Sequence, residues 1–74
     1  MYPNLKAEFA RKDLTLEKVV EKLKENGIRM TVGTLSLKMN KRNKKLAFSF
    51  DEAVVLKKIL ETDLSLEELF EEAG

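Results

Sequence analysis

The strongest constraint on this fold is a set of hydroxyl residues that each stand directly before an amphipathic stretch. A Ser or Thr in that position caps a helix, because its side-chain oxygen accepts a hydrogen bond from an unpaired backbone N–H of the first turn. Glu52 and Glu68 follow two of these residues by three positions and complete capping boxes. The four predicted N-caps are Thr15, Thr31, Ser49 and Ser65.

Apolar residues recur at helical spacing after each cap and also near the N-terminus. Leu5 and Phe9 lie four apart, and Pro3 fits the first turn of that first helix. Gly27 suits the left-handed position that ends the second helix. Residues 46–50 alternate as in a strand, but the capping box favours a helix that begins at Phe50. The sequence therefore predicts an all-α fold of five short helices in one domain, residues 1–74.

Composition excludes several classes of protein. The 74 residues include no Cys, so no disulfide framework supports this small core, and nothing indicates an oxidising compartment. No run of about 18 apolar residues predicts a membrane span, and the N-terminus lacks the plan of a signal peptide. We expect a cytoplasmic protein.

The sequence offers few of the side chains that enzymes use for catalysis. Neither His nor Cys is present, which removes the commonest general base and the strongest nucleophile. The glutamates of the C-terminal segment favour a solvated helix face, and they lack the spacing of a calcium-binding loop. The sequence predicts a protein that is not an enzyme and holds no metal or cofactor.

Charge is divided unevenly along the chain. Residues 1–50 hold twelve Lys and Arg against five Asp and Glu, whereas residues 51–74 hold two against eight. The densest positive charge follows the third predicted helix, residues 31–40, at Lys38, Lys41, Arg42, Lys44 and Lys45. A capped helix with a basic exit suits a phosphate backbone. The same pattern also fits a short core helix followed by a solvated loop.

Five segments of the chain, taken in the order in which they occur, carry a resemblance to a known family. They are Leu14-Thr15, Glu21-Lys22-Leu23, Thr34-Leu35-Ser36-Leu37-Lys38-Met39-Asn40, Phe48-Ser49-Phe50-Asp51-Glu52-Ala53 and Leu64-Ser65-Leu66-Glu67-Glu68-Leu69-Phe70. Over nearly its whole length the chain resembles the lambda-repressor/Cro-like (XRE-type) helix-turn-helix family, which includes small phage repressors. The resemblance implies a compact five-helix regulator whose third helix lies in the major groove of double-stranded DNA while the second crosses the backbone.

The resemblance also implies a binding site along the third helix. Val32, Gly33 and Leu37 fall at base-reading positions, and Leu35 is the inward residue that locks the third helix onto the second. Thr31, Thr34 and Ser36 would contact bases or phosphates, and the cations after them would neutralise phosphates. The full set is Thr31, Val32, Gly33, Thr34, Ser36, Leu37, Lys38, Asn40, Lys41, Arg42, Lys44 and Lys45.

Four features depart from that family. Leu16 stands where the family favours Gln, and Val20 stands where it favours Ala. The connection between the second and third helices, Lys24 to Met30, is longer than the usual Gly-centred turn. The base-reading positions carry no polar side-chain atoms, although Val32 can contact a thymine methyl group. Leu37 fits the core as well as it fits the surface.

Two functions therefore stay open at the level of sequence. One is a DNA-binding transcriptional regulator, and the other is a helical protein–protein interaction module on the same scaffold with weak or no sequence-specific DNA binding. A homodimer through the C-terminal helix is the partner that the resemblance suggests. Its candidates are Leu64, Leu66, Leu69 and Phe70, which a core this small also needs to close itself.

Overall fold

The predicted helices are all present in the computed structural model, which describes residues 2–40 and 47–72. No β-strand occurs within those two ranges. The elements follow in the order α1 (Pro3–Arg11), α2 (Leu16–Glu25), α3 (Val32–Asn40), α4 (Phe50–Leu60) and α5 (Leu66–Leu69). The strand-like alternation before Phe50 does not form a strand at Ala47–Ser49, because the cap at Ser49 starts a helix instead.

Local hydrogen bonds explain where these helices start and stop. The Thr15 hydroxyl accepts from the Lys18 N–H, 3.2 Å away, and both predicted capping boxes are complete, at Ser49 and at Ser65. Gly27 has a φ of 83°, the left-handed conformation expected after α2. The cap positions are thus confirmed, which is the reason that the helix boundaries agree with the sequence to within a residue or two.

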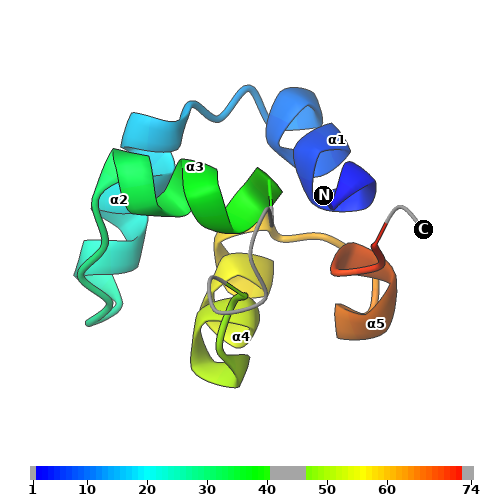
Figure 1. Cartoon of the computed structure of the whole chain (residues 1–74). Coiled ribbons are helices and arrows are strands. Elements are labelled where there is room, and N and C mark those ends of the chain that lie inside the picture. The colour runs from blue at the N-terminus through cyan, green and yellow to red at the C-terminus, as the bar shows by residue number, and fades with distance from the viewer. Residues whose placement is uncertain (1, 41–46, 73–74) are drawn as a thin grey trace.

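The helices are arranged as two groups joined by α4. Helix α3 packs directly against α2, α4 packs against both α2 and α5, and α5 packs against α1 (Figure 1). In Figure 1, α2 and α3 occupy one side of the molecule, and α1 and α5 occupy the other. The long connection does not prevent close packing of α3 on α2, because residues 26–31 turn back along α2 before α3 begins.

One hydrophobic core serves all five helices. Side chains from every helix contribute, and most are fully excluded from solvent. Burial of that kind contributes roughly 1.5–3 kcal/mol for each large apolar side chain, which is the main source of stability in a chain without disulfides. The core consists of Tyr2, Leu5, Phe9, Val19, Leu23, Leu35, Met39, Leu56, Leu60 and Leu69.

Aromatic packing and one buried acid fasten α1 to the C-terminal helices. The rings of Tyr2, Phe48 and Phe70 form a mutual cluster with centroids 5.4–5.7 Å apart. Glu8 of α1 is only 3% exposed, and its Oε1 accepts a hydrogen bond from the Thr62 hydroxyl in the α4–α5 connection. Its other oxygen lies 3.5 Å from Arg11 Nη1. These contacts hold the two ends of the fold together.

Within the described ranges, no helix has the length and apolar character needed to cross a bilayer.

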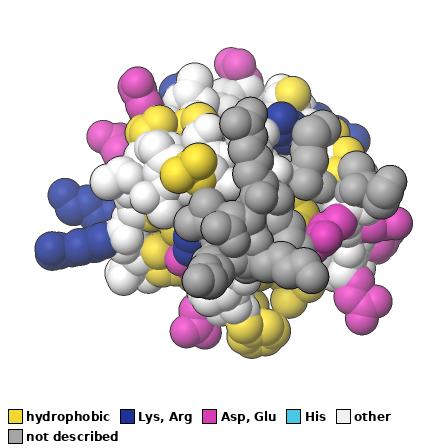
Figure 2. Space-filling view, in the orientation of Figure 1, with side chains coloured by type: hydrophobic (Ala, Val, Ile, Leu, Met, Phe, Trp, Pro, Cys, Tyr) yellow, Lys and Arg dark blue, Asp and Glu magenta, His cyan; other side chains and the backbone are white. Residues whose placement is uncertain are grey.

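A few large apolar side chains are exposed at the surface of the described structure. They are Val32, Leu37 and Phe50, which are 38%, 48% and 74% exposed. Figure 2 shows hydrophobic side chains at the lower edge of the molecule, where α4 begins.

Glu61 offers a test of backbone strain in this fold. It ends α4 with a φ of 49° and a ψ of 42°, a left-handed conformation that disfavours residues with a Cβ by roughly 1–2 kcal/mol. We expect Glu61→Gly to raise the free energy of unfolding by about 0.5–1 kcal/mol, after the larger chain entropy of Gly is subtracted. Urea denaturation measures this directly. Glu61→Ala keeps the Cβ and is the control; an equal gain in both variants would mean that charge, not strain, is responsible.

Candidate nucleic-acid interface

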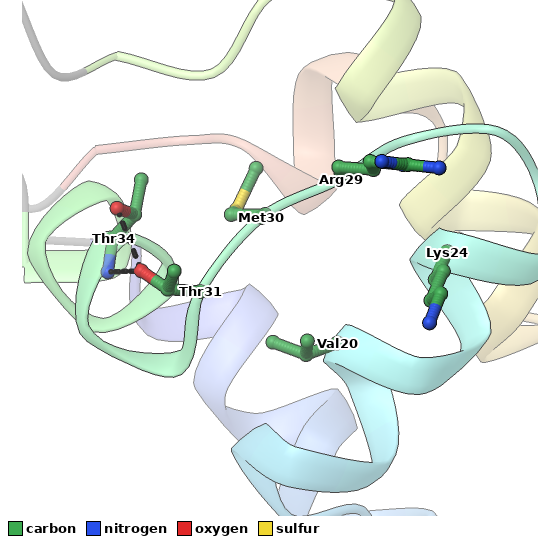
Figure 3. A pocket seen from close by; sticks show the side chains of 6 residues that line it. All are labelled: Val20, Lys24, Arg29, Met30, Thr31 and Thr34. Atoms are coloured by element: carbon green, nitrogen blue, oxygen red, sulfur yellow. Dashed lines mark hydrogen bonds between the residues drawn. The ribbon is translucent and has the colours of Figure 1, made fainter.

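The N-terminal half of α3 is the part of the described structure where polar caps, exposed apolar residues and cations meet. Thr31 caps α3: its Oγ1 accepts from the Thr34 N–H at 3.1 Å and donates to the Thr34 hydroxyl at 2.9 Å (Figure 3). Thr31 is exposed and Thr34 half-buried, so the start of the helix faces solvent. The cap predicted from sequence is confirmed, and it fixes where the positive end of the helix dipole lies.

The outward side of α3 is apolar and uncharged. Because Leu35 and Met39 point into the core, at 0% and 5% exposure, the 3.6-residue period turns a different set of side chains toward solvent. We call this set the α3 outer face. It consists of Val32, Gly33, Ser36 and Leu37, of which Ser36 is half-buried and the others are exposed. Leu37 therefore lies at the surface and does not enter the core.

A groove of about 500 Å³ runs beside the start of α3, between α2 and the chain that leads into α3. Val20 and Met30 supply apolar walls, and the Thr31 and Thr34 hydroxyls border the helix start. In Figure 3, Lys24 of α2 and Arg29 of the connection stand on the side of the groove away from those threonines. Both cations are exposed, and Figure 2 shows Lys and Arg side chains extending into solvent beside α2.

Sequence reasoning did not include Lys24 and Arg29 in the site. In the sequence, both fall in the connection from Lys24 to Met30, with no predicted role in the site. The available signal was the alternation Ile28-Arg29-Met30, in which two half-buried apolar residues flank an exposed cation. Such alternation predicts that the connection lies flat on the core with Arg29 turned outward.

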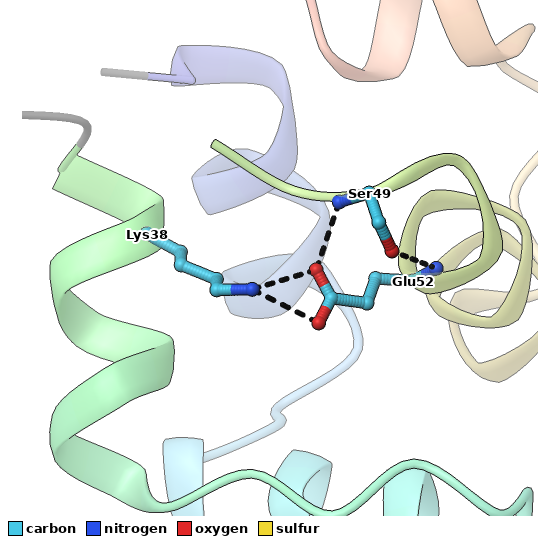
Figure 4. Close-up of polar contacts among 3 residues, drawn as sticks. All are labelled: Lys38, Ser49 and Glu52. Carbon is cyan, nitrogen blue, oxygen red and sulfur yellow. Dashed lines mark hydrogen bonds and ion pairs between the residues drawn. The ribbon is translucent and has the colours of Figure 1, made fainter. Parts of the chain in front are cut away.

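Lys38 occupies a place that its sequence position did not suggest. Its Nζ lies 2.8 and 2.9 Å from the two carboxylate oxygens of Glu52 (Figure 4). The same Nζ sits 6.0 Å from the centre of the Phe48 ring. The side chains of the pair are only 17% and 16% exposed. Lys38 was expected to neutralise a phosphate, but here its charge is matched within the protein. It ties α3 to the first turn of α4.

The same carboxylate caps α4. Glu52 Oε1 accepts from the Ser49 N–H at 2.8 Å, and the Ser49 hydroxyl accepts from the Glu52 N–H at 3.2 Å. Burial is the largest single influence on the pKa of Glu52 and acts to raise it. The hydrogen bonds from Lys38 and Ser49, with the charge of Lys38, outweigh burial together and leave this pKa below its usual range.

Asn40, at the end of α3, donates from its Nδ2 to the Ser36 carbonyl at 3.0 Å. Its amide is thereby turned along the helix. The remaining predicted site residues, Lys41, Arg42, Lys44 and Lys45, lie outside the residues that the structure describes. Their contribution stays a prediction from sequence.

The proposed dimer residues serve the protein's own core in large part. Leu69 is fully buried, and Leu64 and Phe70 pack against the core. Leu66 lines a separate groove of about 530 Å³ beside the exposed Phe50, between the starts of α4 and α5. Leu66 and Phe50 are thus the large apolar side chains that this end of the molecule offers, and Phe50 was not foreseen as a surface residue.

No family model, curated protein or solved structure matches this chain. Within the described residues, no group of three or more His, Cys, Asp or Glu side chains is arranged to hold a metal ion. The chemistry of the candidate site therefore follows from its own geometry: an uncharged helix face, and beside the start of that helix a groove whose far side carries two cations.

The Lys38–Glu52 pair makes stability depend on pH. Because the folded pKa of Glu52 is lowered, the pair stabilises the fold above the unfolded pKa of about 4.3, and that stabilisation is lost as pH falls through the folded pKa. Glu52→Gln keeps the capping geometry and removes the charge, and we expect it to lower the free energy of unfolding by about 1–2 kcal/mol at pH 7. Urea denaturation at pH 7 and pH 3 measures both values. A deficit that persists unchanged at pH 3 would contradict the electrostatic account.

Gly33 has no structural reason to be glycine. Its φ is not in the left-handed region, and an added Cβ would meet only Thr31 Oγ1, at 4.0 Å, beyond its chain neighbours and helix backbone. Gly in a helix is destabilising by roughly 0.5–1 kcal/mol relative to Ala. We expect Gly33→Ala to raise the free energy of unfolding by about 0.5 kcal/mol, since the first turn of a helix feels this penalty least. A lower stability in thermal and urea unfolding would reveal a contact that forbids the methyl group.

Proposed function

We propose that this protein is a DNA-binding transcriptional regulator that inserts α3 into the major groove and lays α2 against the phosphate backbone. The observation that carries the proposal is the α3 outer face, which is exposed on a helix that is itself held firmly by α2. A rigid helix with an accessible first turn is what groove insertion requires. The resemblance of the sequence to lambda-repressor/Cro-like regulators supports the same function.

Charge beside α3 supports a polyanionic partner. Lys24 and Arg29 border the groove at the start of the helix and are exposed, so they can reach a phosphate without leaving an internal partner. The dipole of α3 adds partial positive charge at the same end. The acidic residues of α5, Glu67 and Glu68, are on the element that packs against α1 and α4, away from this end. This distribution allows DNA to approach on one side only.

Lys38 takes a different role in this proposal from the one its sequence position suggests. Its ion pair with Glu52 orients α3 relative to α4, so it acts as a positioning residue and not as a phosphate contact. Phosphate neutralisation then depends on Lys24, Arg29 and the basic segment that follows Asn40. The family resemblance alone suggests two further points: that the protein represses or activates transcription, and that it comes from a phage or prophage.

A second candidate function is a protein–protein interaction module. Val32 and Leu37 are exposed apolar residues on the face that would read bases, and apolar surface suits a protein partner. The two functions differ in their response to salt. Binding to duplex DNA releases counterions and weakens steeply as salt rises, whereas binding through an apolar face does not.

The salt dependence of DNA binding tests the proposed function. With about four cations on phosphates, the plot of log K against log salt should have a slope of about −3 to −4. Lys24→Ala combined with Arg29→Ala removes two of those contacts, so the slope should become shallower by about 2. Fluorescence anisotropy with a labelled random-sequence duplex between about 50 and 200 mM salt measures it.

Lys57→Ala combined with Lys58→Ala is the matched control, because it removes the same charge from the last turn of α4. This control should leave the slope nearly unchanged. Equal slopes in both double variants would show that charge acts without a defined site. Absence of binding to any duplex at low salt would favour the protein-interaction module.

A further inference from the structure

We propose that the α3 outer face selects thymine-rich DNA by packing its apolar side chains against thymine C5-methyl groups. The inference rests on the proposed function and names the sequence class that α3 would select. Three observations support it. The helix α3 has no side chain suited to read guanine, adenine or cytosine by hydrogen bonds, it exposes two apolar side chains, and it carries a glycine between them that its backbone conformation does not require. Val32, Gly33 and Leu37 are the residues to which it assigns specificity.

Hydrogen-bond readout of the other bases finds no suitable side chain in α3. Guanine is read by Arg or Lys, and Lys38, the one cation within Val32–Asn40, is held by Glu52. Adenine is read by Asn or Gln, and the Asn40 amide donates to the Ser36 carbonyl. Cytosine is read by a carboxylate, and α3 contains none. Ser36 can bond to any base edge and so discriminates little.

The apolar residues match the one base feature that remains. In the major groove only thymine presents a methyl group, and apolar side chains read it by contact. Val32 and Leu37 are 38% and 48% exposed, so each has surface to remove from water against such a methyl. These two residues lie five positions apart, at the two edges of the α3 outer face, with Gly33 and Ser36 between them.

Gly33 lies between them on the same face. Within the protein nothing fills the space where its Cβ would be, and its backbone conformation does not call for glycine. A helix that omits a side chain at an open surface position allows another molecule to approach its backbone closely. That approach would bring Val32 and Leu37 within van der Waals reach of the base edges.

The charges around the face identify the occupant as nucleic acid and not as an apolar peptide. Lys24 and Arg29 are exposed on the far side of the groove that adjoins the start of α3, and the face itself carries no charge. An uncharged, apolar face with cations across the adjoining groove fits base edges on the floor of a major groove and phosphates to one side of it. A hydrophobic peptide has no negative charge to pair with those cations.

A pair of duplexes that differ only in methyl groups tests the inference. One is built of A·T pairs alone, and in the other every thymine is replaced by 2′-deoxyuridine, which keeps all hydrogen-bonding groups and removes the methyls. We expect the full chain to bind the thymine duplex about fourfold more tightly for each contacted methyl. Fluorescence anisotropy in one buffer at low salt gives both dissociation constants.

Variants of the face identify the residues that sense the methyl. Val32→Ala and Leu37→Ala should each reduce the thymine-to-uracil ratio toward one, while the uracil duplex is bound almost as before. Phe50→Ala is the matched control, because it removes a more exposed apolar side chain from α4 and should leave the ratio unchanged. Gly33→Ala should weaken binding to both duplexes although it raises the melting temperature.

The outcomes separate the inference from the function on which it rests. Equal affinity for the two duplexes, with the salt dependence retained, would overturn thymine selection and leave DNA binding in place. No binding to either duplex would overturn the proposed function itself. Full affinity in Gly33→Ala would contradict close approach of DNA to α3, and a ratio that falls equally in Phe50→Ala would contradict the assignment to Val32 and Leu37.

Discussion

Burial of Leu35 and Met39 is the constraint on which the arrangement of the site depends. Both side chains enter the shared core, so the rotation of α3 about its axis is fixed. Because a helix repeats every 3.6 residues, fixing the inward residues also fixes which ones face solvent. Gly33 and Leu37 are outward for that reason, whereas Val32, three residues before Leu35, lies at the edge of the inward side and is 38% exposed at the first residue of the helix. The orientation of the proposed site is thus a consequence of core packing with α2.

A second interaction holds α3 against the next part of the fold. The Lys38–Glu52 pair connects the end of α3 to the cap of α4, and a single carboxylate satisfies both the ammonium and the Ser49 amide. A partly buried pair of this kind is favourable because both charges keep hydrogen-bond partners when water is excluded. The result is that α3 is anchored by the core and, near its C-terminal end, by this pair.

The proposed site is also a place where the sequence departs from what stability favours. Gly33 weakens a helix that would accept Ala, and Val32 and Leu37 leave apolar surface in water. Departures of this kind at neighbouring positions are expected at a binding surface, where contacts with a partner compensate for them. Phe50 and the groove beside Leu66 form a second exposed apolar region at the opposite end of α4 from the α2 contact.

The sequence by itself determined the five helices and where each begins. Caps at Thr15, Ser49 and Ser65 and the left-handed Gly27 act over three or four residues, and interactions of that range can be read from a pattern. The inward position of Leu35 followed from the same helical period.

Only the tertiary structure decided what the side chains around α3 do. Lys38 finds its partner fourteen residues along the chain at Glu52, and no local pattern reveals that pairing. Lys24 and Arg29 line one groove with Thr31 and Thr34, on its far side, because the connection folds back along α2. Leu37 suited core and surface equally in the sequence, and the packing of α3 turned it outward. Contacts between distant segments depend on how helices pack, and that is settled by the whole core at once.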